Sequence, residues 1–244
     1  MIDKKKMQFD IITIFPEVFE NYFNASIIKR AQKKGLIKIK IHNLRKWATD
    51  KHKTVDDKPY GGGPGMILKA DVIYRAIKKI QDSGFRTKGS RIILLSPKGK
   101  QFNQKMAYWY SKLNRIILIC GHYEGVDARV EKFVDEKISI GPYVLTGGEL
   151  PAMVIVDAVT RLIPGVIKEE SLKEESFSFK KDKKNKLGIE NWKLGNFYEY
   201  PQYTRPAVLT IKDKFGKIKI LKVPKVLLSG NHQKIKEWRM KRIK

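Results

Sequence analysis

Three glycine-bearing turns stand directly after apolar runs of the sequence, where they could bind a ligand. SPKG follows RIILL, GHYEG follows RIILIC, and GPYVLTGGELP follows KISI. In open α/β sheets, ligands bind at the carboxyl ends of the strands. Backbone amides at Gly121, Gly147 and Gly148 can approach an adenine or ribose closely, because no side chain obstructs them. Each turn alone is more often a simple chain reversal, so the prediction depends on their grouping.

Several other catalytic patterns are missing from the sequence. No GxGxxG joins a strand to a helix, and PYGGGPGM follows a charged stretch and lacks the Lys-Ser/Thr ending of a phosphate loop. By composition alone, this segment is more often a surface loop. Four scattered histidines and one cysteine have no zinc-ligand spacing, so no metal site is predicted. Without GxSxG, nucleophile-elbow acyl transfer has no support.

The elements that must position these turns alternate along the first two thirds of the chain. Apolar runs predict strands in FDIITIF, LIKIKIH, RIILLSP, RIILICG and KISIG, and helical spacing appears in NASIIKRAQKKG, ADVIYRAIKKIQDSG, NQKMAYWYSKL and PAMVIVDAVTRLIPG. This order is typical of an α/β fold with a largely parallel sheet. A charged, linker-like segment follows, then VLTIKDKFGKIKILKV, which alternates about Phe215-Gly216. NHQKIKEWRMKRIK predicts a short basic helix.

The charge balance favours a nucleic-acid partner. Lys and Arg number 51 against 25 Asp and Glu, which leaves a formal charge of +26. A general preference for lysine explains part of this surplus, but not the shortage of acids. The single cysteine, Cys120, lies in an apolar run and fits a reducing compartment. No signal peptide or membrane-length run is found, so we expect a cytoplasmic protein.

Eight ordered motifs resemble one known family. They are FDIITIFPEVF, TVDDKPYGGGPGM, LLSPKG, ILICGHYEGVDARV, SIGPYVLTGGELPAM, RLIPGV, YPQYTRP and VLLSGNH. Together they resemble the bacterial tRNA (guanine-N1)-methyltransferases of the SPOUT class, over nearly the whole chain. The resemblance implies a parallel-sheet α/β domain at 1–166 with a deep trefoil knot at about 91–155. A linker at 167–196, with a lysine-rich insertion, and a small, mainly helical tRNA-binding domain at 197–244 would follow. It also implies a homodimer with the active site at the subunit interface.

The resemblance implies that S-adenosylmethionine binds in the knot loops. Backbone groups of Leu95, Gly141, Tyr143 and Leu145 would bond the adenine, with Glu124 near the methionine part. The implied cofactor-binding residues are Leu94, Leu95, Ser96, Pro97, Gly121, Tyr123, Glu124, Ile140, Gly141, Tyr143, Leu145, Gly147, Gly148 and Pro151. Magnesium is associated with the family's reaction, but no residue of this sequence identifies its ligands.

Methylation of guanine at N1 requires a base that removes the N1 proton and a cation for the charge that spreads onto the neighbouring oxygen. By resemblance the cation is Arg161. The base position, usually aspartate, holds Glu175, which is one methylene longer and displaces the carboxylate by about 1.5 Å. The family usually has arginine at His122 and aspartate at Pro142. The first departure would weaken contact with the nucleotide or the methionine carboxylate, and the second changes a knot loop in which backbone bonding matters.

For RNA recognition, the resemblance implies contacts from His52, Asp56, Gly61, Gly62, Gly63, Arg205 and Asn231. Asn231 has a simpler interpretation as the cap of the last helix. The leading hypothesis is methyl transfer to the guanosine immediately 3′ of the anticodon, at position 37, which maintains the reading frame. One alternative is a knotted methyltransferase for another RNA or a ribose hydroxyl. Another is a basic RNA-binding protein that has lost catalysis.

Overall fold

The computed structural model describes residues 6–82, 89–173, 177, 179–181, 192–194 and 200–242. The chain divides into two compact units, Met1–Glu169 and Glu170–Lys244. None of the described helices is long and apolar enough to cross a membrane.

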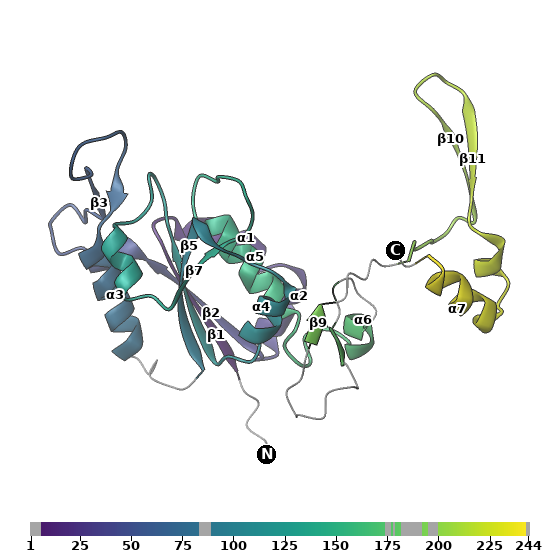
Figure 1. Ribbon diagram of the computed structural model, residues 1–244, viewed down its shortest axis with the longest axis horizontal. Helices are drawn as coiled ribbons and strands as arrows, with labels where there is room; N and C mark the ends of the chain where they lie inside the picture. The colour runs from purple at the N-terminus through teal and green to yellow at the C-terminus, as the bar shows by residue number, and fades with distance from the viewer. Residues whose placement is uncertain are drawn as a thin grey trace, which may run out of the picture. The chain divides into compact units, whose positions relative to one another are not determined.

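Unit 1 is built on a five-stranded parallel sheet in the order β2-β1-β6-β5-β7 (Figure 1). Its strands are β1 (Met7–Thr13), β2 (Ile37–Asn43), β5 (Ser90–Gln101), β6 (Arg115–Cys120) and β7 (Glu136–Ser139). All five correspond to the predicted apolar runs. The parallel α/β fold is therefore confirmed.

The SPKG segment differs from the expected simple turn, because it lies within β5. The pairing of β5 with β7 shifts register between Leu95 and Lys100. At Gly99 the two backbones approach so closely that an added Cβ would lie 2.5 Å from the Ile138 nitrogen. Glycine is therefore required where β5 passes β7, and the segment before it is free to bulge outward.

Helices cover both faces of the sheet. They are α1 (Glu20–Phe23), α2 (Ser26–Lys33), α3 (Ala70–Asp82), α4 (Gln104–Tyr110) and α5 (Glu149–Thr160), with the 3-10 turns η1 (Pro16–Phe19), η2 (Leu44–Trp47) and η3 (Ala128–Lys132). The short helix α6 (Glu169–Lys173) lies at the boundary between the two units. One core joins α2, α4 and α5 to side chains such as Ile11 and Leu118. The other joins α3 to Ile12 and Ile117, the alternate positions of the same strands. Buried on both faces, β6 is apolar at every position after Arg115.

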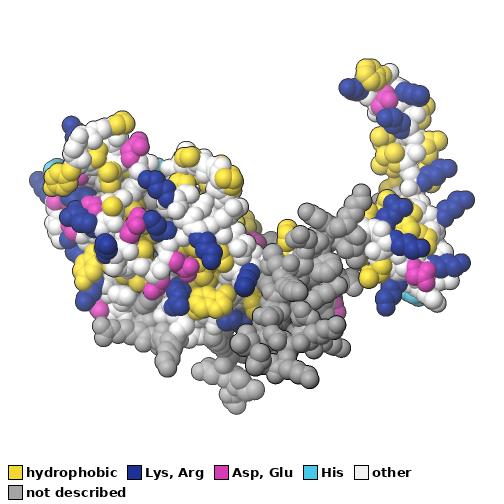
Figure 2. All heavy atoms as spheres, viewed as in Figure 1, with side chains coloured by type: hydrophobic (Ala, Val, Ile, Leu, Met, Phe, Trp, Pro, Cys, Tyr) yellow, Lys and Arg dark blue, Asp and Glu magenta, His cyan; other side chains and the backbone are white. Residues whose placement is uncertain are grey.

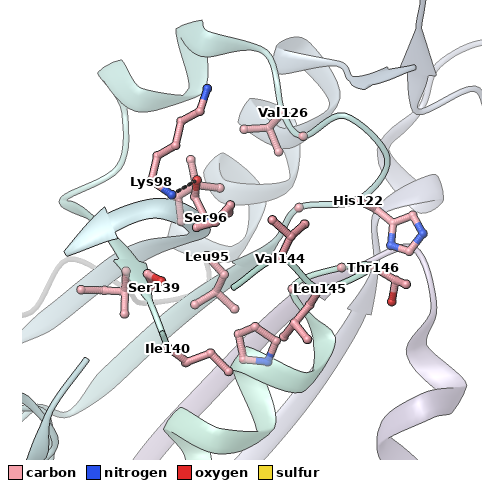
Figure 3. Close-up of a pocket in the computed structure, with 18 of the residues that line it drawn as sticks. Leu95, Ser96, Lys98, His122, Val126, Ser139, Ile140, Val144, Leu145 and Thr146 are labelled. Atoms are coloured by element: carbon pink, nitrogen blue, oxygen red, sulfur yellow. Dashed lines mark hydrogen bonds between the residues drawn. The ribbon is translucent and has the colours of Figure 1, made fainter. Parts of the chain in front are cut away.

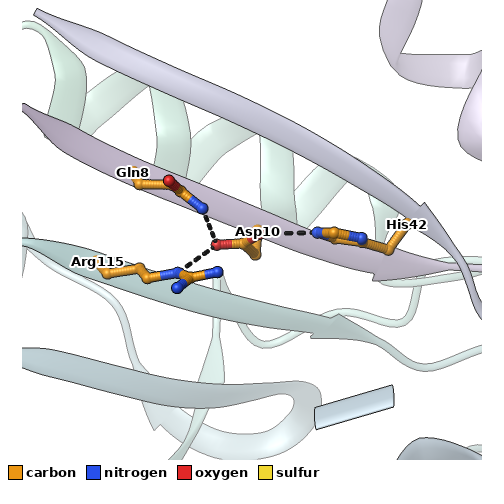
Figure 4. A network of polar contacts seen from close by, with 4 residues as sticks. All are labelled: Gln8, Asp10, His42 and Arg115. Carbon is orange, nitrogen blue, oxygen red and sulfur yellow. Dashed lines mark hydrogen bonds and ion pairs between the residues drawn. The ribbon is translucent and has the colours of Figure 1, made fainter. Parts of the chain in front are cut away.

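A buried ion network crosses three of the strands (Figure 4). The Asp10 carboxylate in β1 accepts hydrogen bonds from Arg115 Nε at 2.7 Å and Gln8 Nε2 at 2.8 Å, and contacts His42 Nε2 at 2.7 Å. Asp10 is fully buried. Burial alone would raise its pKa, but the hydrogen bonds from His42, Arg115 and Gln8 outweigh this effect and lower the pKa.

Unit 2 contains short strands β8 (Phe179–Lys181) and β9 (Trp192–Leu194), which pair antiparallel. Further along, β10 (Val208–Lys212) and β11 (Ile218–Lys222) form an antiparallel hairpin, followed by η4 (Lys225–Leu228) and α7 (His232–Met240). The sequence alternation about Phe215-Gly216 and the final basic helix are both found. The described part of this unit thus contains two antiparallel strand pairs beside its short helices, whereas the resemblance implied a mainly helical domain.

Candidate active site

A cavity of about 350 Å³ lies at the carboxyl ends of β5, β6 and β7 (Figure 3). It has the size of a small-molecule site. All fourteen residues predicted to bind the cofactor line it: Leu94, Leu95, Ser96, Pro97, Gly121, Tyr123, Glu124, Ile140, Gly141, Tyr143, Leu145, Gly147, Gly148 and Pro151. Three segments far apart in the sequence therefore meet at one place.

The cavity also contains residues that were not among the predicted cofactor-binding residues. They are Lys98, His122, Gly125, Val126, Ala128, Glu131, Ile138, Ser139, Val144 and Thr146. Most of them lie in or beside the predicted turns, and His122 was already named as a departure from the family. Ser139 has a clear structural task, because its hydroxyl donates to the Gly141 carbonyl at 2.9 Å and accepts from the Gly141 N–H at 3.2 Å. This pair of bonds holds the start of the loop after β7.

The glycines at the cavity wall are needed for close backbone packing. Gly148 donates its N–H to the Gly121 carbonyl at 2.8 Å, and a Cβ on Gly148 would lie 2.6 Å from the Cys120 Cα. A Cβ on Gly121 would meet nothing nearer than the Leu95 carbonyl oxygen at 3.5 Å. Gly148 is thus constrained by its neighbours, whereas Gly121 leaves space beside the cavity.

A buried carboxylate stands behind this wall. Glu149, the first residue of α5, is 8% exposed, and its Oε1 accepts a hydrogen bond from Thr13 Oγ1 at 2.7 Å. Its Oε2 lies 3.8 Å from Nδ1 of His122, whose ring packs edge-on against Phe15 and Tyr123. Burial, together with the nearby Glu149, raises the pKa of the Cys120 thiol, so Cys120 is unsuited to nucleophilic chemistry.

The glycine-rich segment adjoins the cavity and is held at its ends. β3 (Asp56–Asp57) and β4 (Ile67–Leu68) pair antiparallel at its base. The Glu124 N–H donates to the Met66 carbonyl at 3.1 Å, and a Cβ on Gly65 would lie 2.5 Å from Glu124 Cγ. The segment is exposed, as expected of a surface loop, but these contacts attach its ends to the rest of unit 1. Neighbouring Gly61, Gly62 and Gly63 all have positive φ.

Two predicted RNA-binding residues lie before this loop. Asp56 belongs to β3 and pairs with Leu68. His52 is exposed in a turn in which Asp50 accepts hydrogen bonds from the His52 and Thr54 backbones and from the Thr54 hydroxyl. The bonds from Thr54 lower the pKa of Asp50. Neither His52 nor Asp56 lines the cavity, so both remain predictions for a larger ligand.

The predicted catalytic pair is described only in part. Arg161 follows α5 as its C-cap, is half-buried, and does not line the cavity. Glu175 falls outside the described residues, so the structure does not test it as the base. Of the two departures from the family, His122 lines the cavity and Pro142 is exposed in the loop after β7.

The remaining RNA-binding predictions concern unit 2. Arg205 is exposed and lines a second cavity of about 300 Å³ with Tyr200, Tyr203 and Arg239. Asn231 accepts a hydrogen bond from the Lys234 backbone N–H at 3.0 Å, which makes it the N-cap of α7. The capping interpretation is therefore confirmed, whereas an RNA contact of Asn231 is untested.

The donor set fits an organic cofactor better than a metal. Within the described ranges, no group of three or more His, Cys, Asp or Glu side chains could hold a metal ion. The cavity offers apolar side chains from Leu94, Leu95 and Ile138 beside the backbone of the glycine turns. This combination suits a nucleoside with a charged extension, for which Glu124 and Glu131 are the carboxylates in the lining.

A parallel sheet with a glycine-walled cavity at its carboxyl edge defines an α/β protein with an enzyme-like ligand site. A sequence model described as tRNA (Guanine-1)-methyltransferase TrmD matches residues 7–244. The chain therefore belongs to the tRNA (guanine-N1)-methyltransferase family, as its motifs predicted.

Individual relatives agree with this assignment. The tRNA (guanine-N(1)-)-methyltransferase of Dictyoglomus turgidum is 51% identical over 236 residues, covering 96% of this chain and 84% of that protein. The Clostridioides difficile protein of the same name is 49% identical over 235 residues, with coverage of 96% and 90%. The crystal structure of tRNA (m1G37) methyltransferase from Aquifex aeolicus superposes with a TM-score of 0.71 at 35% identity, covering 96% of this chain and 88% of that one.

Proposed function

We propose that this protein transfers the methyl group of S-adenosylmethionine to N1 of the guanosine at position 37 of tRNA, immediately 3′ of the anticodon. The proposal rests on one observation: all fourteen residues that were predicted to bind the cofactor line the same cavity. Family membership supplies the reaction, and the charge of +26 fits the polyanionic substrate.

The cavity residues have distinct tasks in this proposal. Backbone groups of Leu95, Gly141, Tyr143 and Leu145 bond the adenine, and Glu124 lies near the charged methionine part. When bound, the cofactor supplies an electrophilic methyl group. The close passage of β5 and β7 at Gly99 is compatible with a trefoil knot over about 91–155, which we include in the proposal. A magnesium ion stays a prediction of the resemblance, and within the described ranges no group of three or more His, Cys, Asp or Glu side chains identifies its ligands.

Proton removal and charge stabilisation come from Glu175 and Arg161. The Glu175 carboxylate accepts the N1 proton as the new bond forms, and Arg161 stabilises the negative charge that develops on the guanine oxygen. A displacement of about 1 Å can slow an enzyme about a hundredfold. The backbone around Glu175 must therefore shift to compensate for the longer side chain if the rate is to equal that of an enzyme with aspartate at this position.

The remaining parts of the proposal concern assembly and RNA. His52, Asp56 and Gly61 to Gly63 contact the target guanosine, while Arg205 and the basic side chains of α7 contact phosphates. Residues 167–196 link the methyltransferase domain, 1–166, to the tRNA-binding domain, 197–244. Two copies of the chain form a homodimer and share the active site, in the cytoplasm where tRNA is modified.

Methyl transfer from labelled S-adenosylmethionine to tRNA transcripts tests the proposal. We expect labelling of transcripts that carry guanosine at position 37, and no labelling of transcripts that carry adenosine there. Glu175→Gln should reduce the single-turnover rate by about a thousandfold, whereas Glu174→Gln should leave it within about threefold. If Glu175→Gln still labels tRNA at the wild-type rate, a residue other than Glu175 is the base. Cofactor and tRNA binding without any labelling would instead indicate an RNA-binding protein that has lost catalysis.

A further inference from the structure

No described part of the chain covers either face of the hairpin of β10 and β11. Every residue of both strands is exposed. The exposed apolar side chains are Val208, Leu209, Ile211, Ile218, Ile220 and Leu221. An isolated two-stranded hairpin is only marginally stable in water, and contiguous exposed apolar surface usually marks a binding site. The hairpin is therefore expected to bind a partner.

The charge of the hairpin specifies the kind of partner. Between residues 208 and 222 there are five lysines and one aspartate. Asp213 is occupied within the turn, where its Oδ1 accepts hydrogen bonds from the Phe215 and Lys217 backbones at 3.0 Å and its Oδ2 lies 3.8 Å from Lys219 Nζ. The outward charge is thus positive, as the dark blue side chains along the hairpin show in Figure 2.

Lysines and aliphatic residues share the faces of the hairpin. Cross-strand pairs place Lys222 opposite Val208, Lys219 opposite Ile211, and Lys212 opposite Ile218. Side chains that face each other across a ladder lie on the same side of the sheet. The alkyl stem of lysine can lie on an aliphatic neighbour while the ammonium group reaches outward. A second copy of the hairpin would bring the same positive charge, which disfavours self-association.

The tip of the hairpin carries an aromatic side chain between lysines. Phe215 is 82% exposed, and Lys214 Nζ lies 5.0 Å from the centre of its ring. An exposed aromatic ring with adjacent cations can stack on an unpaired base while the cations contact phosphates. RNA offers such bases in its loops.

We infer that the β10–β11 hairpin is an RNA-binding arm, in which the lysines contact phosphates and Phe215 stacks on an unpaired base outside the target site. The choice of tRNA as the RNA rests on the proposed function. The arm itself rests only on the exposure, charge and register of unit 2.

A shortened variant tests the arm directly. The Val223 N–H donates to the Ala207 carbonyl at 2.9 Å, so the two chain ends already meet. Replacing 208–222 by Asn-Gly closes them with a two-residue turn. We expect tRNA affinity to fall at least tenfold at 150 mM salt, and the slope of log K against log salt to decrease in magnitude by about 3. S-adenosylmethionine affinity by calorimetry should not change.

Point variants separate charge from stacking. Lys214→Glu, Lys217→Glu and Lys219→Glu combined should reproduce the loss of salt dependence. The matched control reverses three exposed lysines of α2 and α3, at Lys29, Lys33 and Lys78, and should weaken tRNA binding less. Phe215→Ser should weaken binding about tenfold with the salt slope unchanged, and Phe215→Tyr should restore it.

The outcomes distinguish this inference from the proposed function. Hairpin-dependent tRNA binding without methyl transfer would sustain the arm and refute the methyltransferase. Methyl transfer by the shortened variant with unchanged tRNA affinity would support the methyltransferase and refute the RNA-binding arm. Sedimentation of the wild type and the shortened variant measures the oligomeric state of each. If shortening converts a dimer to a monomer, the hairpin is a protein contact and the RNA-binding arm is wrong.

Discussion

The Glu149 carboxylate lies between Thr13 and His122, with Oε2 at 3.8 Å from the His122 Nδ1. That ring nitrogen is buried and has no hydrogen-bond partner among the described residues. On the other side, Thr13 Oγ1 donates to Oε1 at 2.7 Å. The carboxylate is thus fixed by Thr13 and directed toward a histidine of the cavity wall, so β1 supports the loop that follows β6.

Removing the donor to this carboxylate should destabilise unit 1. In Thr13→Val, Glu149 Oε1 stays buried without its hydrogen bond, so the free energy of unfolding should fall by about 1–3 kcal/mol. Chemical denaturation followed by circular dichroism measures the change. Thr146→Val, at an exposed position of the cavity rim, is the control and should change stability by less than about 0.5 kcal/mol. Equal stability of the two variants would contradict the role of Thr13.

Alanine should destabilise the protein at one of two adjacent cavity glycines, Gly148, and be tolerated at the other, Gly121. In Gly148→Ala, the new methyl group would lie 2.6 Å from the Cys120 Cα, and backbone must move to admit it. We expect a loss of about 1–3 kcal/mol and no measurable cofactor binding. Gly121→Ala has an ordinary contact at 3.5 Å and should fold with wild-type stability. Thermal melting and calorimetry report the two properties; a stable Gly148→Ala protein would show that the wall is adaptable.

The Asp10 network should make stability depend on pH below 4. The pKa of Asp10 is lowered from its ordinary value of 3.8, so its stabilising effect is fully present above that value and is lost as pH falls through the lower folded pKa. Asp10→Asn should remove this acid dependence and cost about 3 kcal/mol at pH 7, because Arg115 loses a buried charged partner.

The control for this network is a surface ion pair. Asp71 Oδ2 lies 2.9 Å from Arg75 Nη2 across one turn of α3, where the Asp71 side chain is 56% exposed and the Arg75 side chain 36%. Asp71→Asn should lower the free energy of unfolding by no more than about 0.5 kcal/mol. Unfolding midpoints measured from pH 2.5 to 7 compare the two variants. Parallel pH curves for wild type and Asp10→Asn would contradict the assignment.

The Cys120 thiol should not react with thiol reagents in the folded protein. Burial, with the nearby Glu149, raises the pKa of its thiol, so almost no thiolate forms at neutral pH. Ellman's reagent should react only as the protein unfolds, at a rate that rises with denaturant. Rapid modification of the native enzyme would indicate that the wall between β6 and α5 opens.

The sequence by itself determined the α/β class of the fold and fourteen of the residues that line the cavity. Strand and helix spacing depends on local burial, so the runs around Ile11 and Leu118 and the helical spacing of α3 were visible without coordinates. The motif order identified the family and, with it, the fourteen residues that line one cavity. The cap formed by Asn231 was also predictable, because capping is a local interaction.

Only the tertiary structure decided how distant residues meet. Thr13 and Glu149 are 136 residues apart, and no pattern in the sequence pairs their side chains. The attachment of the glycine-rich loop to the turn at Glu124 likewise depends on strand pairing across the chain. The exposure of the β10–β11 hairpin is of the same kind, because an alternating apolar pattern predicts a covered face. Whether another element covers that face depends on non-local packing, which local sequence does not encode.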